Sequence, residues 1–347
     1  MTDRPVHRPR AASPPLVSEG LPSRLPSRLP SRRTLLSAGL WLAAASVLRP
    51  ARAAGTVRIG YQKYGSLVLL KGRGTLERAL KPLGIDVAWS EFPSGPPLME
   101  ALNAGAIDLG SAGEAPPIFA QAASAELRYV GNEPPAPRGE AILVPKDSPV
   151  RSVADLRGRT IALNKGSNVH FLLVRALEKA GVPYDAVKLA FLGPADANAA
   201  FVRGAVDAWA IWDPYLAAAE RATGARIVAD GDGVAPNRQF YLSRRGFTDA
   251  SPEIVSAILT AIGEVDAWAA GNADTVASEL AASVGIPAPV LAVALGRLSY
   301  GVAPLDAQTI ADQQAVADAF HGLGLLPKPI RVADAVWAHP DRKAELR

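Results

Sequence analysis

The strongest constraint on the fold is a pattern of residues that occurs twice, about a hundred positions apart. Residues 57–61 form an apolar run typical of a strand, and Gly65-Ser66 then opens an apolar helical run. Residues 160–163 and Gly166-Ser167 repeat this order. A strand followed by a helix, in two copies, predicts two similar α/β lobes whose helix amino termini face each other across a cleft.

The correspondence extends over a second segment of each copy. Residues 100–108 and 199–207 share a helical run, a turn with glycine and a final aspartate, Asp108 or Asp207. Aspartate side chains at turns commonly accept hydrogen bonds from nearby backbone N–H groups. We therefore expect both aspartates to brace the local backbone and to leave the ligand to other residues.

The order of the predicted elements defines the fold class as α/β. Short β-rich runs alternate with helical runs, as in parallel sheets covered by helices, and after residue 251 only helical runs follow. One of these carries an apolar stripe from Ile254 to Ala269 that predicts packing on the first lobe. Gly72 and Gly74 predict that the first helix is short or bent. The predicted strands are residues 57–61, 86–92, 107–110, 127–130, 141–144, 160–163, 187–191, 208–211 and 226–229.

Proline-rich segments indicate where the chain crosses between the lobes. Prolines cluster in residues 133–137 and 145–149, on either side of one predicted strand, and residues 231–237 provide a return. Two crossings form a two-stranded hinge. The predicted parts are residues 1–53 (leader), 54–147 (first lobe, first part), 148–238 (second lobe) and 239–347 (first lobe, second part, helical).

The leader holds a positive charge that the rest of the chain lacks. Of the 37 Lys and Arg residues, 9 lie in it, against 2 of the 33 Asp and Glu, so the remainder carries 28 basic and 31 acidic residues. That net charge of −3 gives no footprint for nucleic acid.

The leader also has the features of an export signal. Residues 1–30 are predicted to be disordered, Arg32-Arg33 precede an apolar run, and a small-x-small cleavage site ends at Ala53. We expect cleavage near Ala53 and a periplasmic protein. The paired arginines favour a twin-arginine signal, with an ordinary Sec signal as the alternative.

The composition excludes several classes of chemistry. The chain contains no cysteine, so disulfides, thiolate catalysis and a lipid anchor are all ruled out. Gly-x-Ser-x-Gly, Walker A and His-Glu-x-x-His motifs are absent as well, and the histidines lack metal-ligand spacing. We expect a monomer with no enzymatic activity, no cofactor and no metal.

The two Gly-Ser corners are the leading candidates for ligand contact. Ser66 and Ser167 are predicted at N-cap positions, where a hydroxyl ordinarily bonds a free N–H of the first turn. Both corners follow a strand at the carboxyl edge of a sheet, where open α/β proteins bind ligands. Because helix amino termini favour anions, the pair predicts donors suited to the three oxygens of a sulfonate.

Acidic and aromatic residues near the same edge are a second group of candidates. Glu114 and Asp213 each precede a helix, and either stabilise it through its dipole or meet an amino group of a ligand. Trp212 and Tyr215 offer apolar surface to a short carbon tail. His170 either packs within its helix or contacts the ligand.

These candidates lie in segments that resemble the periplasmic aliphatic sulfonate-binding proteins of ABC importers, within the sulfonate, taurine and nitrate substrate-binding family. The resemblance covers nearly all of residues 56–340. It is carried by IGYQK at 59–63, EFPSGP at 91–96, LNAGAIDLG at 102–110, PPIFAQAA at 116–123, VADLRG at 153–158, KGS at 165–167 and WAIWDPY at 209–215.

The resemblance implies a type II periplasmic-binding-protein fold that encloses an alkanesulfonate between its lobes. It also implies delivery of that ligand to an inner-membrane ABC permease and its ATPase, for sulfur acquisition. Taurine, another aminosulfonate or a nitrate-like oxyanion is the alternative ligand, and a same-fold enzyme such as a sulfinate desulfinase is the alternative from another class. The predicted ligand-binding residues are Gln62, Gly65, Ser66, Ser94, Gly95, Glu114, Lys165, Gly166, Ser167, Asn168, His170, Trp212, Asp213 and Tyr215.

Overall fold

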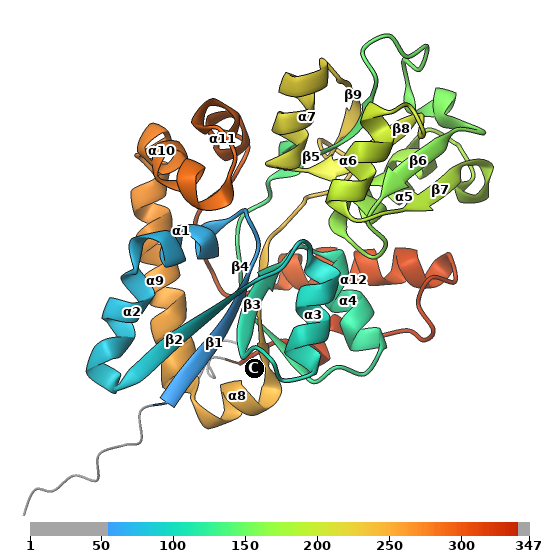
Figure 1. Cartoon of the computed structure of the whole chain (residues 1–347). Coiled ribbons are helices and arrows are strands. Elements are labelled where there is room, and N and C mark those ends of the chain that lie inside the picture. The colour runs from blue at the N-terminus through green and yellow to red at the C-terminus, as the bar shows by residue number, and fades with distance from the viewer. Residues whose placement is uncertain (1–54, 339–347) are drawn as a thin grey trace, which may run out of the picture. The chain divides into compact units, whose positions relative to one another are not determined.

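The computed structural model describes residues 55–338, so the predicted leader and export signal lie outside the described residues. Within them the strands form two five-stranded sheets, each flanked by helices (Figure 1). We call the first sheet with its helices lobe 1 and the second sheet with its helices lobe 2. The predicted α/β class and two-lobed arrangement are confirmed.

The sheet of lobe 1 has the strand order β2-β1-β3-β10-β4. β1 pairs in parallel with β2 and β3, whereas β10 is antiparallel to both β3 and β4. The strands are β1 (Gly55–Tyr61), β2 (Ile85–Glu91), β3 (Leu109–Ala112), β4 (Leu127–Asn132) and β10 (Phe240–Arg244).

The sheet of lobe 2 has the order β7-β6-β8-β5-β9, which is the same topology. β6 pairs in parallel with β7 and β8, and β5 is antiparallel to β8 and β9. The strand that arrives from the other lobe therefore takes the same place in both sheets. The strands are β5 (Glu140–Val144), β6 (Thr160–Leu163), β7 (Lys188–Phe191), β8 (Ala208–Trp212) and β9 (Arg226–Asp230).

Matching aspartates confirm the duplication at the level of hydrogen bonds. A carboxylate oxygen of Asp108 accepts from the backbone N–H of Arg58 at 3.0 Å, and Asp207 accepts from that of Thr160 at 2.8 Å. Arg58 also pairs with Asp108 through its side chain. Both aspartates brace the backbone, as predicted.

The strand β10 was not predicted, and one boundary was wrong. We placed the strand at 141–144 in lobe 1, which was to end at residue 147, but β5 lies in the sheet of lobe 2. The first crossing is therefore residues 133–139, and the second is residues 231–239. Every residue of β5 is buried, and an apolar run of this kind fits a central position in either sheet equally well.

Helices follow the strands at the positions that the sequence predicts. Gly74 has a left-handed conformation that ends α1 and separates it from α2, which confirms the predicted interruption. The helices of lobe 1 up to the first crossing are α1 (Ser66–Arg73), α2 (Thr75–Leu80), α3 (Gly95–Asn103) and α4 (Ala115–Ala122), and those of lobe 2 are α5 (Asn168–Lys179), α6 (Pro194–Val202) and α7 (Tyr215–Thr223).

The C-terminal helices pack on lobe 1, and two of them also contact lobe 2. Buried Ile258 and Ile262 of α9 share one apolar cluster with Leu67 of α1, and burial of each such side chain contributes about 2 kcal/mol. Ala294 of α11 packs on Ala217 of α7, and Phe320 of α12 lies 5.3 Å from the ring of His170. These helices are α8 (Arg245–Ala250), α9 (Pro252–Ala270), α10 (Ala273–Val284), α11 (Ala288–Leu295) and α12 (Ala307–Gly322).

Within residues 55–338, no single helix is long and apolar enough to cross a bilayer, and α9 with α10 meets the length and composition criteria only as a pair bent by 116°.

Candidate functional site

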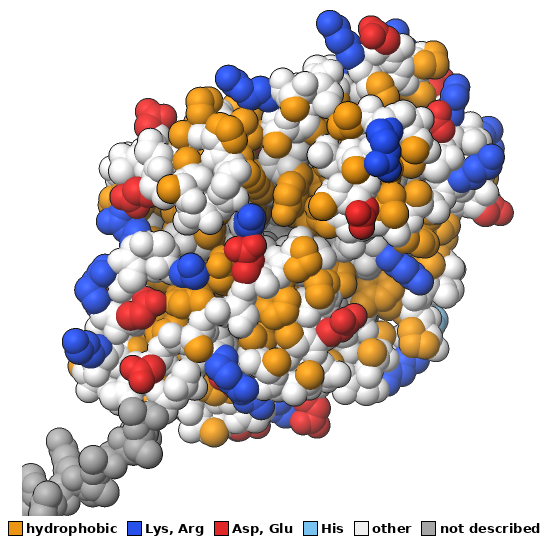
Figure 2. Space-filling model, viewed as in Figure 1, with side chains coloured by type: hydrophobic (Ala, Val, Ile, Leu, Met, Phe, Trp, Pro, Cys, Tyr) orange, Lys and Arg blue, Asp and Glu red, His pale blue; other side chains and the backbone are white. Residues whose placement is uncertain are grey.

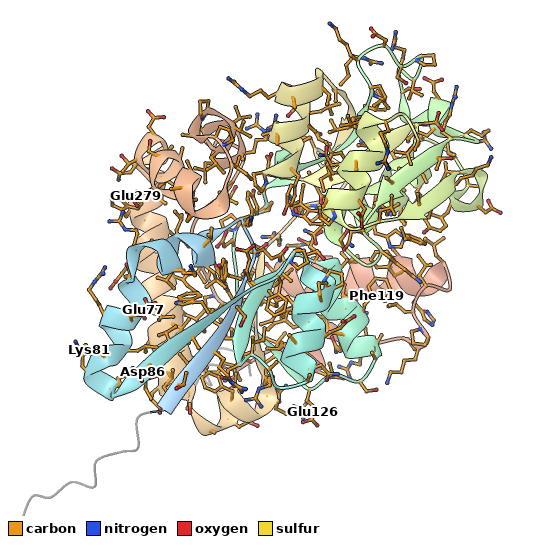
Figure 3. The ribbon with its side chains drawn as sticks, viewed as in Figure 1. Glu77, Lys81, Asp86, Phe119, Glu126 and Glu279 are labelled. Carbon is orange, nitrogen blue, oxygen red and sulfur yellow. The ribbon has the colours of Figure 1, made fainter. Side chains whose placement is uncertain are left out.

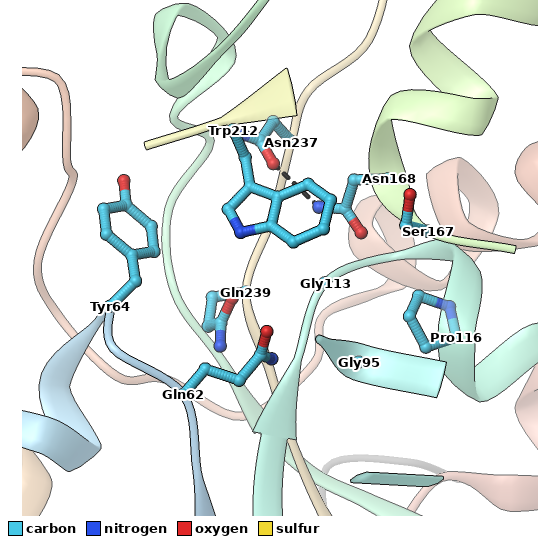
Figure 4. Close-up of a pocket in the computed structure, with 10 residues that line it drawn as sticks. All are labelled: Gln62, Tyr64, Gly95, Gly113, Pro116, Ser167, Asn168, Trp212, Asn237 and Gln239. Carbon is cyan, nitrogen blue, oxygen red and sulfur yellow. Dashed lines mark hydrogen bonds between the residues drawn. The ribbon is translucent and has the colours of Figure 1, made fainter. Parts of the chain in front are cut away.

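A small pocket lies between the lobes, at the carboxyl ends of the parallel strands (Figure 4). This is the edge at which open α/β sheets bind ligands. Figure 2 shows hydrophobic side chains on both sides of the hollow between the lobes. The pocket is lined by Gln62, Tyr64, Gly95, Gly113, Pro116, Ser167, Asn168, Trp212, Asn237 and Gln239.

Lobe 1 contributes loops and helix starts. Gln62 and Tyr64 follow β1, and the amide of Gln62 donates to the carbonyl of Ser111 at 3.2 Å, which fixes its side chain at the sheet edge. Gly95 is the first residue of α3, and Gly113 and Pro116 flank the start of α4. Two helices of lobe 1 thus begin at the pocket with the positive ends of their dipoles, although the prolines at the second and third positions of each supply no N–H.

Lobe 2 contributes a third helix start and an aromatic wall. Ser167 is the N-cap of α5 and Asn168 is its first residue, while Trp212 ends β8. Asn237 and Gln239 come from the second crossing and close the remaining side. Figure 4 shows the indole of Trp212 between Tyr64 and Asn168.

Asn168 of lobe 2 contacts both the second crossing and lobe 1 at the pocket. Its Nδ2 donates to Oδ1 of Asn237 at 2.8 Å, and Nδ2 of Asn237 donates to the carbonyl of Ala136. The side chain of Asn168 also lies against Gly113, where an added Cβ would come within 1.9–2.2 Å of its amide atoms. Gly113 is therefore required for this approach of lobe 1 to lobe 2.

The pocket offers an anion many hydrogen-bond donors and no formal charge. None of its ten lining residues, all within the described part of the chain, is charged at neutral pH. The hydroxyl of Tyr64 is buried without a hydrogen-bond partner among residues 55–338. Burial, assisted by Asp213 and Glu133, raises the pKa of Tyr64 well above its usual value, so this phenol stays protonated and can donate.

The two Gly-Ser corners share a positive φ at glycine but not a role. Gly65 and Gly166 have φ of 82° and 72°, the left-handed region that favours glycine, and each turns the chain from a strand into a helix. Ser167 lines the pocket, but its hydroxyl donates to the carbonyl of Asn164 at 2.7 Å and does not cap α5. Gly65 and Gly166 are not among the lining residues.

The predicted N-cap position of Ser66 was wrong. Ser66 is the first residue of α1 and its N-cap is Gly65. Its hydroxyl contacts Oε1 of Glu133 at 2.9 Å and Oδ1 of Asp266 in a buried cluster behind the pocket. Burial, followed by the charge of Asp266, raises the pKa of Glu133 to about 8, so a carboxyl proton is retained there at neutral pH.

Glu114 braces the second crossing and does not line the pocket. Its buried Oε1 accepts from the backbone N–H of Arg238 at 3.0 Å, and the carbonyl of Glu114 accepts from Gln313. Burial raises the pKa of Glu114 to about 7, against the opposing effect of Arg238. Glu140 is another buried acid, and its side-chain oxygens have no hydrogen-bond partner among residues 55–338. Burial, followed by the charge of Glu114, raises the pKa of Glu140.

Asp213 pairs with a cation of lobe 1. Nη1 of Arg297, which follows α11, lies 3.5 Å from both carboxylate oxygens of Asp213, and Nη2 lies 2.8 Å from Oε2 of Glu220. Asp213 also accepts from the N–H of Ala217 in the first turn of α7. Burial raises the pKa of Asp213 to about 6, and Arg297 limits the rise. Asp213 therefore links the lobes and stabilises a helix start beside the pocket.

His170 packs in the interior. The N–H of Gly166 donates to its Nδ1 at 3.2 Å, which places the ring proton on Nε2, 2.6 Å from the hydroxyl of Tyr184. Burial, followed by the charge of Lys165, lowers the pKa of His170 to about 4, so the ring is neutral. It does not line the pocket, and of the two roles that the sequence left open the packing role is the one found.

The remaining predicted residues, Tyr215, Ser94 and Lys165, are not among the residues that line the pocket. Tyr215 packs edge-on against Trp212 with ring centroids 6.3 Å apart and so supports the pocket wall. Ser94 is the buried N-cap of α3, one residue before Gly95. Lys165 lines a separate groove and its Nζ lies 5.5 Å from the centroid of Phe191.

Five lining residues were not among the sequence predictions: Tyr64, Gly113, Pro116, Asn237 and Gln239. Three of them follow strands that were predicted correctly, so their place at the carboxyl edge was a usable signal. Asn237 and Gln239 lie in the second crossing, next to the strand that was missed. Their role depends on how that crossing passes the pocket, which no local pattern indicates.

Two sheets of matching topology, joined by two crossings and enclosing a pocket, define a binding protein of the type II periplasmic fold. Residues 81–275 match the family described as NMT1/THI5 like. The chain belongs to this family. An aliphatic sulfonates-binding protein of Escherichia coli (strain K12) is 44% identical over 284 residues, which are 81% of this chain and 88% of that protein.

A second curated relative and a solved structure show the same likeness. The taurine-binding periplasmic protein of Escherichia coli (strain K12) is 28% identical over 181 residues, 51% of this chain and 55% of its own. The alkanesulfonate-binding protein of Xanthomonas axonopodis pv. citri, bound to MOPS, superposes with a TM-score of 0.78 at 44% identity and covers 83% of this chain and 99% of its own.

Proposed function

We propose that this protein is the periplasmic substrate-binding component of an ABC importer that captures aliphatic sulfonates between its lobes and delivers them to a membrane permease and its ATPase. The observation that carries the proposal is the uncharged, donor-rich pocket between the lobes. The 44% identity to an aliphatic sulfonates-binding protein supports the choice of ligand, and the periplasmic relatives support export by the predicted signal.

The donors of the pocket suit a sulfonate. Three helices begin at its wall, and the amides of Gln62, Asn168 and Gln239 with the Tyr64 hydroxyl surround the same space. Hydrogen bonds to a charged group contribute about 1.5 to 3 kcal/mol each. Pro116 and Trp212 provide apolar surface for the first carbons of the tail.

The size of the ligand requires that it be enclosed. Micromolar binding needs about −8 kcal/mol, whereas the best small ligands reach roughly −1.5 kcal/mol per heavy atom. Ethanesulfonate has about six heavy atoms, so nearly all of them must be contacted. A pocket lined by both lobes and by the second crossing meets this need, and a surface site does not.

The pocket favours alkanesulfonates over taurine. Asp213 and Glu114, the two carboxyls that the sequence offered to a ligand amine, are occupied by Arg297 and by the backbone of Arg238. Neither lines the pocket. A ligand ammonium would therefore lose its water without gaining a carboxylate, which is costly.

Calorimetry with ethanesulfonate, taurine, sulfate and nitrate tests the proposal. Ethanesulfonate should bind most tightly, with one site per chain, and tighter binding of nitrate or taurine would contradict the ligand assignment. Asn168→Asp adds a like charge to the pocket and should weaken ethanesulfonate by at least about a hundredfold. Asn198→Asp, at an exposed position of α6, is the matched control and should leave the affinity unchanged.

A further inference from the structure

A second hollow borders the pocket on the side of α3 and α4. It is a largely apolar groove formed by one face of each of these helices and by two residues of lobe 2. Figure 3 shows Phe119 on α4, beside the underside of lobe 2. Its apolar lining consists mainly of Pro96, Met99, Pro116, Phe119, Ala120 and Ala123, with Gly166 and Lys165 on the side of lobe 2.

The groove and the pocket share a thin wall. Pro116 lines both hollows, and on each side of it consecutive residues divide between them: Gly95 faces the pocket and Pro96 the groove, while Ser167 faces the pocket and Gly166 the groove. An added Cβ at Gly95 would lie 2.5 Å from Cγ of Pro116, so the divide is one residue thick.

The divide lies between the two lobes. Gly95 and Pro116 belong to lobe 1 and Gly166 and Ser167 to lobe 2, so both lobes contribute to the divide. The ring of Phe119 lies on the groove side of the divide and faces lobe 2, where an added Cβ at Gly166 would be 3.4 Å from it. Phe119 also packs edge-on against Phe320 of α12, at 4.9 Å between centroids.

The chemistry of the groove suits a hydrocarbon chain. Its polar and charged residues, Glu100, Asn103 and Lys165, are exposed, whereas the rest of its lining consists mainly of proline, methionine, phenylalanine and alanine side chains. Exposed apolar surface rimmed by polar residues is typical of ligand-binding grooves.

We propose that this groove holds the tail of longer alkanesulfonates, whose sulfonate lies in the pocket and whose chain passes the ring of Pro116. The inference rests on the proposed function and extends it, since it assigns medium-chain alkanesulfonates to the protein as preferred ligands. The groove adjoins the ligand pocket at Pro116, and its polar lining side chains, those of Glu100, Asn103 and Lys165, are exposed, so a hydrocarbon on the apolar wall leaves none of them buried without a partner.

Calorimetry with a series from ethanesulfonate to octanesulfonate tests the proposal. Each methylene that enters the groove should tighten binding about fourfold, until the chain reaches the exposed rim and the gain stops. Ala120→Trp should remove this gain while leaving ethanesulfonate within twofold of its normal affinity. Ala222→Trp, at an exposed position of α7, is the control and should keep the full gain.

The outcomes separate the inference from the function on which it rests. Tight ethanesulfonate binding with no gain along the series, or a gain that survives Ala120→Trp, overturns the tail site and leaves the proposed function intact. If the unaltered protein does not bind ethanesulfonate, both the tail site and the proposed function are overturned. Should Ala120→Trp fail to fold, Ala123→Trp at the exposed end of the groove makes the same test. A variant that loses only transport by the permease would assign the groove to that partner and overturn the tail site.

Discussion

Glu114→Gln is predicted to make the folded protein less sensitive to alkaline pH. Glu114 is buried, accepts a hydrogen bond from the N–H of Arg238, and has a second oxygen without a partner among residues 55–338. Burial raises its pKa from 4.5 to about 7, against Arg238 and with the charge of Asp312. Glutamine keeps the acceptor and cannot ionise, so it imitates the protonated acid.

The size of the effect follows from linkage. A carboxyl whose pKa is raised on folding stabilises the native state at low pH, and this stability is lost as pH rises from 4.5 through 7. Between about pH 5 and pH 8 the loss for one such group is about 2.5 kcal/mol. Glu114 also raises the pKa of Glu140, so removing its charge adds to the difference in the same direction.

Urea denaturation of both proteins at pH 5 and pH 8 measures this. The normal protein should lose about 2.5 kcal/mol more than Glu114→Gln between the two pH values, because any fixed cost of the new amide cancels in the difference. Glu126→Gln is the control, because residue 126 is exposed and directly precedes β4. Its stability should depend on pH as that of the normal protein does. Equal pH dependence of Glu114→Gln and the normal protein would refute the reasoning, and a selective loss of taurine binding would return Glu114 to the ligand site.

Two further predictions concern the contacts between the lobes. Gly113→Ala should displace the Asn168 amide and break its hydrogen bond to Asn237, so that the affinity for ethanesulfonate in calorimetry falls about three- to tenfold. Gly72→Ala is the control, because the space around its Cβ is open. Equal affinities of the two variants would show that the contact between Gly113 and Asn168 does not support binding. Arg297→Met should lower the free energy of unfolding by about 3 kcal/mol, because it leaves buried Asp213 without its cation. Arg221→Met, at an exposed position of α7, should cost far less in the same urea titration, and a similar loss for both would show that the pair does not stabilise the fold.

The fold was predictable from the sequence because local patterns and the duplication agree. Each predicted strand is present, and Gly74 ends the first helix where the sequence indicates. The boundary at 147 failed because β5 is buried along its whole length, so its apolar pattern does not say which sheet it joins. Strand β10 was missed because its apolar run covers only residues 240–242, before polar Ser243 and Arg244.

The site was predictable only in part. The motif around Trp212 and the corner at Ser167 lead to the pocket, since both lie where a parallel strand ends. The duplication suggested the same role for Ser66, but a helix start does not reveal where a hydroxyl points, and Glu133 and Asp266 are close to it only in the folded chain. Asn237 reaches the pocket through the second crossing, a long-range contact that leaves no local pattern.

A crystal structure of the protein with ethanesulfonate tests the central claim most directly. The sulfonate is expected between the lobes, with its oxygens within hydrogen-bond distance of the Tyr64 hydroxyl and the Asn168 amide and with its carbons against Trp212 or Pro116. A sulfonate bound outside this pocket, or held by the side chain of a Lys or Arg residue, would contradict the account.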